Sequence, residues 1–137
     1  MSNPLTIDAS VFVNAFSAAE EGSENSWRFL LGLKESNTPI IVPTLLLAEV
    51  VASIARKQNN TEQALNWMLE IQRIPNIMFI NIDESLAETA AEIAATHRLR
   101  GSDAIYAAIA RRFATELVSL DKEHLERVKK VVSVRRP

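Results

Sequence analysis

The segment Leu5-Thr6-Ile7-Asp8-Ala9-Ser10-Val11 joins a short apolar run to an acidic residue. Leu5 to Ile7 predicts a strand, because a short apolar run bounded by a polar residue is typical of strands that are covered on both faces. Asp8 ends that strand, and the residues after it follow a helical pattern. The segment therefore predicts a strand-to-helix junction with a carboxylate at the carboxyl end of the strand.

The same order of elements recurs along the chain. Further short strands are predicted at 40–42, 77–82, 117–120 and 131–134. Helices are predicted at 24–34, 44–57, 60–74, 83–97 and 103–113, with a short one starting at Asp121. Pro43 suits the start of the 44–57 helix, where its missing amide proton is not needed. Alternating strands and helices predict an α/β fold whose central parallel sheet has helices on both faces.

Length and composition fit one compact domain over residues 1–137. The absence of cysteine excludes disulfides, zinc–thiolate sites and a thiol nucleophile. No run of about 20 apolar residues is present, so no membrane span is predicted. Met1 to Thr6 has neither a charged region nor a long apolar run, so no signal peptide is predicted. We therefore expect a cytoplasmic protein.

The net charge of −2 hides an asymmetry along the chain. From His97 to Pro137 there are ten Lys and Arg residues against five Asp and Glu, a net charge of +5 that leaves −7 for the rest. Basic helix faces that are simply solvated would explain this distribution. A surface that contacts a phosphate backbone would explain it equally well.

Three aspartates stand where an element begins or ends. Asp8 and Asp121 each follow a predicted strand, and Asp103 follows Ser102 at a predicted helix start. Taken singly, each is explained by helix capping or by the attraction of a carboxylate to the positive end of a helix dipole.

Glu49 is less easily explained as a structural residue. It lies in an apolar helix, with Leu45, Leu46 and Ala52 at helical spacing around it. A buried carboxylate without a partner is costly, so a partner or a function is expected. An ion pair with an arginine such as Arg56 or Arg111 is one alternative.

Considered together, the four acids suggest one site. Carboxyl ends of parallel strands share one edge of a sheet, where ligands of such folds bind, so Asp8 and Asp121 should lie close together. Asp103 opens a helix and Glu49 lies on the helix after the second strand, so their side chains can converge on the same place. Clustered carboxylates repel one another and favour a divalent cation. Oxygen ligands without His or Cys select Mg²⁺ or Mn²⁺ over zinc.

Four segments resemble, in order, the motifs of PIN domains. Thr6-Ile7-Asp8-Ala9-Ser10-Val11 resembles the first motif, and Leu47-Ala48-Glu49-Val50 resembles the second. Arg100-Gly101-Ser102-Asp103-Ala104-Ile105-Tyr106-Ala107-Ala108-Ile109-Ala110 resembles the third, a helix rich in small residues, and Leu117-Val118-Ser119-Leu120-Asp121-Lys122-Glu123 the fourth. The resemblance covers essentially the whole chain. Within the family the chain is most similar to the VapC-type toxins of VapBC toxin–antitoxin modules.

This resemblance implies a PIN-like three-layer α/β fold, Mg²⁺ or Mn²⁺ as cofactor, and endoribonuclease activity, with a small antitoxin protein as partner. The catalytic and metal-binding candidates are Asp8, Glu49, Asp103 and Asp121; Glu49 is the one that could instead position the attacking water. The hydroxyls of Ser10 and Ser119 are expected to hydrogen-bond a ligand carboxylate or a phosphate. The candidates for RNA phosphate contacts are Arg98, Arg100, Arg111, Arg112 and Lys122.

Other residues are interpreted as structural. His97 and His124 share no ligand spacing and are expected at the surface, whereas Trp27, Trp67, Phe113 and Tyr106 fit packing roles. A haloacid-dehalogenase phosphatase or a receiver domain would leave Glu49 unexplained. The stronger alternative is a catalytically weak or inactive PIN-fold protein that binds RNA or another protein.

A homodimer is expected from surplus apolar surface. The helices at 44–54 and 62–74 carry more apolar residues than one sheet face needs, including Leu65, Trp67, Met68, Leu69 and Ile71. Such faces commonly mark contacts between subunits. A thick monomer core is the alternative.

Overall fold

The computed structural model describes residues 3–137. Met1 and Ser2, which begin the stretch in which no signal peptide is predicted, lie outside the described residues. Among the helices that the structure describes, none combines the length and apolar character needed to cross a membrane.

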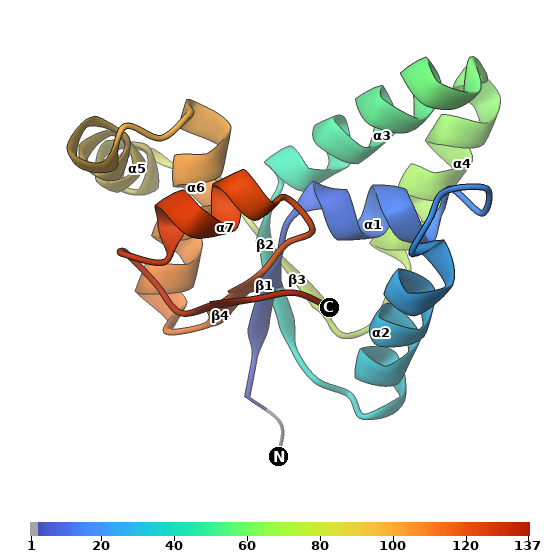
Figure 1. Ribbon diagram of the computed structural model, residues 1–137, viewed down its shortest axis with the longest axis horizontal. Helices are drawn as coiled ribbons and strands as arrows, with labels where there is room; N and C mark the ends of the chain where they lie inside the picture. The colour runs from blue at the N-terminus through green and yellow to red at the C-terminus, as the bar shows by residue number, and fades with distance from the viewer. Residues whose placement is uncertain (1–2) are drawn as a thin grey trace.

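Within residues 3–137 a five-stranded sheet forms the centre of the molecule (Figure 1). Its strands are β1 (Leu5–Ile7), β2 (Ile40–Pro43), β3 (Ile77–Ile80), β4 (Glu116–Val118) and β5 (Val134–Arg135). They lie in the order β3-β2-β1-β4-β5, and every neighbouring pair is parallel. The parallel sheet predicted from the alternating elements is therefore confirmed, with β1 at its centre and β4 beside it.

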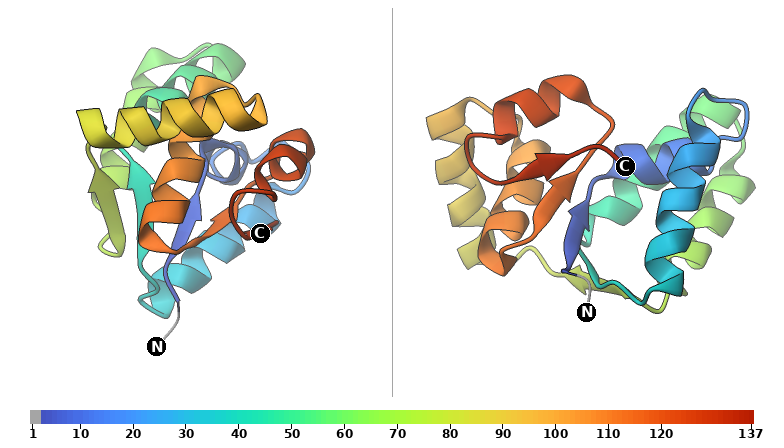
Figure 2. Two further views of the ribbon diagram at one scale, coloured as in Figure 1. Left: turned by 90° about the vertical axis from the view of Figure 1, so that its left-hand side faces the viewer. Right: turned by 60° about the horizontal axis from the view of Figure 1, so that its bottom comes forward.

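Helices cover the sheet on both sides. They are α1 (Ala9–Ala15), α2 (Ser23–Glu35), α3 (Leu45–Gln58), α4 (Thr61–Gln72), α5 (Glu84–His97), α6 (Gly101–Phe113) and α7 (Lys122–Val128). In Figure 1 the strands run between α5, α6 and α7 on the left and α1 to α4 on the right, and Figure 2 shows the same division from two other sides. The three-layer α/β arrangement is thus the observed one.

The alanines of α6 determine how closely that helix approaches the sheet. Ala104, Ala107 and Ala108 are fully buried, and α6 packs against β1, β2 and β4. Small side chains at these positions let the helix axis lie near the strands while the interior stays closely packed. The first turn of α6 is therefore held beside the carboxyl ends of β1 and β4.

Several predicted element boundaries are wrong: the strand predicted at 77–82 ends at Ile80, the one predicted at 117–120 spans Glu116–Val118, and two further differences have their cause in the sheet. Pro43 is the last residue of β2, and the amide of Thr44 still donates to the carbonyl of Ile80 at 3.0 Å, so α3 begins only at Leu45. The last strand is Val134–Arg135, because the apolar residues 131 and 132 belong to the turn after α7 and only half bury their side chains. In both cases pairing with a neighbouring strand overrode the local pattern.

Candidate active site

Asp8 lies between β1 and α1 and is almost fully buried. Its Oδ1 accepts hydrogen bonds from the amide of Ser10, at 3.0 Å, and from the Ser10 hydroxyl. Burial raises the pKa of Asp8 above the usual aspartate value, although the hydroxyls of Ser10 and Ser119 and the nearby His124 oppose the shift. The buried carboxylate is therefore costly for the fold, as is typical of groups kept for chemistry.

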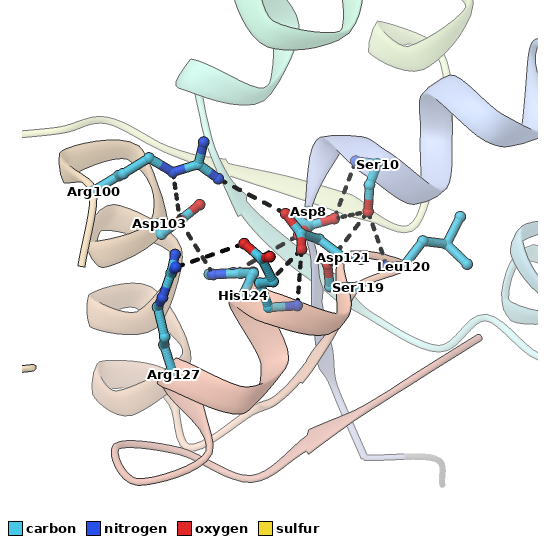
Figure 3. Close-up of polar contacts among 10 residues, drawn as sticks. Asp8, Ser10, Arg100, Asp103, Ser119, Leu120, Asp121, His124 and Arg127 are labelled. Carbon is cyan, nitrogen blue, oxygen red and sulfur yellow. Dashed lines mark hydrogen bonds and ion pairs between the residues drawn. The ribbon is translucent and has the colours of Figure 1, made fainter. Parts of the chain in front are cut away.

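Asp103 and Asp121 approach Asp8 from two other elements (Figure 3). Asp103 lies in the first turn of α6, and its Oδ2 is 3.2 Å from Nε of Arg100. Asp121 caps α7: its Oδ1 accepts from the amides of Glu123 and His124, and its Oδ2 is 3.8 Å from Nη2 of Arg100. Arg100 thus lies between the two carboxylates.

His124 lies at the centre of the acidic cluster, so the prediction that it is a surface residue is wrong. Its side chain is 1% exposed, with Nδ1 3.5 Å from Oδ2 of Asp103 and Nε2 3.8 Å from Oδ2 of Asp8. Neither ring nitrogen has a hydrogen-bond partner among the described residues. Burial alone would lower the pKa of His124, but Asp103, Asp8 and Asp121 together raise it.

The sequence contained a weak indication of this position. His124 precedes the buried Val128 by four residues, so the two share one face of α7, and that face packs inward. His97, by contrast, is half-buried at the end of α5.

Glu49 joins the cluster from α3. The hydroxyl of Tyr106 donates to its Oε1 at 2.7 Å. Burial raises the pKa of Glu49, and the charges of Asp8 and Asp103 raise it further, whereas Tyr106 opposes the shift. Tyr106 was expected to pack, and its ring is indeed buried, but it also orients this carboxylate. No arginine is paired with Glu49 among the residues that the structure describes.

The serine hydroxyls connect the ends of β1 and β4. Ser10 Oγ accepts from the amide of Leu120 at 3.0 Å, and Ser119 Oγ accepts from the amide of Asp121 at 3.0 Å. The two oxygens are 3.4 Å apart. These bonds fix the loop that carries Asp121 against the loop that carries Asp8.

The basic candidates divide into two groups. Arg100 lies among the acids, whereas Arg98 and Lys122 are exposed near the starts of α6 and α7. Arg111 and Arg112 lie in the last turn of α6, about 12–14 Å along the helix from Asp103. Arg112 donates to the Ser85 hydroxyl at 3.1 Å. The structure therefore does not place this second pair beside the acids.

The donor atoms fit a hard divalent cation. They are carboxylate oxygens, the ligands that Mg²⁺ and Mn²⁺ prefer. Among the described residues, no three acidic or histidine side chains are close enough to bind one ion as they stand. Mg²⁺ commonly uses only one or two carboxylates and completes its shell with water. Asp8 and Asp103 lie on either side of His124, and Arg100, whose side chain is 68% exposed, is paired with Asp103.

Comparison with known proteins identifies the family. Residues 5–131 match the family model of the PIN domain. The chain belongs to the PIN domain family. A search of curated proteins found no match.

Solved structures share this PIN fold over nearly their whole length. VapC20 from Mycobacterium tuberculosis, described as a Sarcin-Ricin loop cleaving toxin, aligns with a TM-score of 0.76 at 19% identity, covering 98% of this chain and 99% of that one. VapBC2 from Rickettsia felis, bound to a DNA fragment from its promoter, aligns with a TM-score of 0.72 at 16% identity, covering 98% of both chains. FitAcB from Neisseria gonorrhoeae aligns with a TM-score of 0.68 at 21% identity, covering 95% of both chains. At these identities the likeness shows the fold.

Proposed function

We propose that this PIN domain is a metal-dependent endoribonuclease that hydrolyses RNA phosphodiester bonds. The observation that carries the proposal is the meeting of Asp8, Asp103 and Asp121 beside the carboxyl ends of β1 and β4 (Figure 3), with Glu49 on α3 close enough for the charges of Asp8 and Asp103 to raise its pKa. Burial raises the pKa values of Asp8 and Glu49, and carboxyl groups kept in a cluster at this cost indicate a site for a cation and a reaction.

The four acidic residues would have different roles in the proposed reaction. Asp8 and Asp103 would hold Mg²⁺ or Mn²⁺, with Asp121 completing the acidic site. The bound cation would offset charge on the phosphate and promote ionisation of the attacking water. Glu49 has a raised pKa and a carboxylate fixed by Tyr106, which suits a group that orients water and accepts its proton.

Basic residues around the acids would contact the substrate. Arg100 already bridges Asp103 and Asp121, and a phosphate that enters the site would compete with these carboxylates for its guanidinium. Arg98 and Lys122 are exposed nearby and would contact the backbone on either side. Arg111 and Arg112 are left out of the proposed site because of their distance from it.

We further propose that the nuclease is the toxin of a toxin–antitoxin module and binds a small antitoxin. The solved structures that share its fold include the VapBC2 assembly and the VapC20 toxin, which supports this role. We also propose a homodimer, for which the exposed Leu65 and Leu69 on α4 would supply part of the interface.

A catalytically inactive PIN-fold protein is the second candidate. It is favoured by one observation: Arg100 and His124 lie among the acids, and no three-ligand group exists among the described residues. The two candidates are separated by incubating a labelled RNA with the protein while Mg²⁺ or Mn²⁺ is titrated. Saturable, cation-dependent cleavage supports the nuclease; RNA binding without cleavage at any cation concentration supports the inactive protein.

A further inference from the structure

A groove of about 650 Å³ leads away from the acidic cluster between α1 and α3. At one end Ser10, Glu49 and Asp121 line it, so it opens directly onto the proposed reaction site. At the other end it reaches Arg56 and Lys57 near the end of α3. α1 and α3 lie side by side in Figure 1 and pack against each other, which makes the groove a fixed feature of the fold.

One face of α3 forms a wall of this groove. Glu49, Ala52, Ser53 and Arg56 follow one another at spacings of three and four residues, so their side chains lie along the same side of the helix. Glu49 and Arg56 are about 10 Å apart along the helix axis. Between them the side chains are short, and the wall leaves room for an extended strand.

Arg56 is the cation that remains available in the groove. Its neighbour Lys57 is 2.9 Å from Oε2 of Glu20, which lowers the pKa of that carboxyl, and Asn14 donates to the other carboxylate oxygen at 3.2 Å. This ion pair is neutral as a whole. Arg56 has no ion-pair partner within residues 3–137 and is exposed.

We propose that this groove holds the RNA strand on one side of the bond that is cleaved, and that Arg56 binds the phosphate of a neighbouring nucleotide. The inference rests on the proposed function, because the acids at the near end are what place the reacting phosphate. A guanidinium matches the geometry of a phosphate and remains charged at any physiological pH. The exposed guanidinium of Arg56 at the far end of the groove favours a nucleotide strand, with its charged phosphates, over an uncharged stretch of polypeptide.

Filling the groove tests the proposal without touching an acidic residue. Ala52 is exposed and lines the groove, so Ala52→Phe obstructs the strand and should leave the fold intact. The matched control is Ala87→Phe, at an exposed position of α5 that does not line the groove. Circular dichroism and thermal melting check that both variants fold.

The probe is a fluorescein-labelled single-stranded RNA of about 12 nucleotides, the order of a single-strand binding site. Binding is measured by anisotropy in proteins that also carry Asp8→Asn, so that cleavage does not interfere. Ala52→Phe is expected to weaken binding at least tenfold, and Ala87→Phe less than twofold. Equal binding by both variants overturns the proposal.

The proposed role of Arg56 is tested by measuring how RNA binding depends on salt concentration. Arg56→Gln should weaken binding and reduce the slope of log affinity against log salt by about 0.7, the loss of one phosphate contact on a single strand, whereas Arg56→Lys should retain most of the slope. Arg73→Gln, at the residue that follows the end of α4 and outside the groove, is the matched control. An unchanged slope in Arg56→Gln overturns the role of Arg56.

The two proposals fail in different ways. A protein that never cleaves RNA, but whose binding falls in Ala52→Phe, contradicts the nuclease and supports the groove. A protein that cleaves RNA normally despite Ala52→Phe supports the nuclease and contradicts the groove. If the wild-type protein neither binds nor cleaves the probe, both are contradicted.

Discussion

Asp8 uses its two carboxylate oxygens for different purposes. Oδ1 accepts from the amide and hydroxyl of Ser10 and so caps α1, while Oδ2 points toward His124, 3.8 Å away. The two interpretations that the sequence left open, helix cap and metal ligand, are therefore compatible. An oxygen that is not needed for capping remains free to bind a cation.

Glu49 provides a test of charge within the site, because its pKa is raised by burial and by Asp8 and Asp103. A carboxyl whose folded-state pKa is raised destabilises the fold while ionised. That penalty is present above the folded-state pKa and disappears as the pH falls below the unfolded-state value. Glu49→Gln removes the charge, and its side-chain oxygen still accepts from Tyr106.

We therefore expect Glu49→Gln to increase the metal-free free energy of unfolding by about 0.5 kcal/mol or more near pH 8, a size within the usual range of single substitutions. Below about pH 4 the difference should vanish, because the wild-type carboxyl is then neutral as well. Denaturant titrations at both pH values measure it, with the exposed Glu92→Gln as control. A loss of stability near pH 8 would contradict the expectation.

For individual residues of the site, the sequence predicted the positions along the elements better than the contacts between side chains. Asp8 and Asp121 were placed correctly because the ends of parallel strands share an edge whatever the details of packing. The pairing of Glu49 with Tyr106 could not be foreseen, because the two residues are 57 positions apart and meet only when α3 and α6 pack. His124 was missed because its burial depends on how α7 is oriented.

The ends of some elements are determined by nearby residues in the sequence, and the ends of others by tertiary contacts. Asp83 accepts from the amide of Leu86 at 2.8 Å and Asn60 from that of Gln63 at 3.0 Å, as is common for Asp and Asn at the start of a helix. The end of β2 at Pro43 and the position of β5 did not follow the local sequence pattern, since pairing with neighbouring strands determines where both strands lie. Caps involve neighbours in sequence, whereas strand ends depend on distant partners.

The end of α6 offers a test at the scale of an element. Ala114 follows the helix with φ of 53°, in the left-handed region that is costly for residues with a Cβ. We expect Ala114→Gly to increase the free energy of unfolding by about 0.5–1 kcal/mol. In Ala91→Gly, at an exposed position inside α5, it should instead fall by about 1 kcal/mol. Chemical denaturation compares the two, and a destabilised Ala114→Gly would show that the strain is absent.

At the scale of the whole molecule, the order of strands and helices was sufficient to predict the class of fold. Alternation leaves few topologies, because parallel strands need helical crossovers of one hand. The sequence could not show which apolar residues remain exposed. Of the surplus residues on α4, Ile71 is fully buried, while Leu65 and Leu69 are 45% and 44% exposed. Only the packed structure distinguishes core from surface here.

The proposed homodimer can be tested through that exposed pair. Leu65 and Leu69 are one helical turn apart on α4 and form an apolar patch that association would cover. We expect the wild-type protein to sediment as a dimer at micromolar concentration and Leu69→Lys to shift the population to monomer. The exposed Glu62→Lys, on the same helix, controls for added charge. A wild-type monomer at these concentrations would rule out the dimer.

The central claim is that Asp8 holds a catalytic cation, and Asp8→Asn tests it most directly. Asparagine caps a helix about as well as aspartate, so the fold should survive. Without metal, stability should hold or rise, because a buried charge beside other carboxylates is removed. Mn²⁺ should stabilise the wild type, by about 2.7 kcal/mol at 100 times its dissociation constant, and the variant should lose most of that gain.

The deciding measurement combines thermal melts of both proteins, with and without Mn²⁺, and a cleavage assay on the same labelled RNA. We predict that wild type cleaves the RNA and melts at a higher temperature with Mn²⁺, whereas Asp8→Asn folds, responds weakly to Mn²⁺ and does not cleave. An Asp8→Asn variant that is fully active and keeps the wild-type response to Mn²⁺ would contradict the assignment of Asp8.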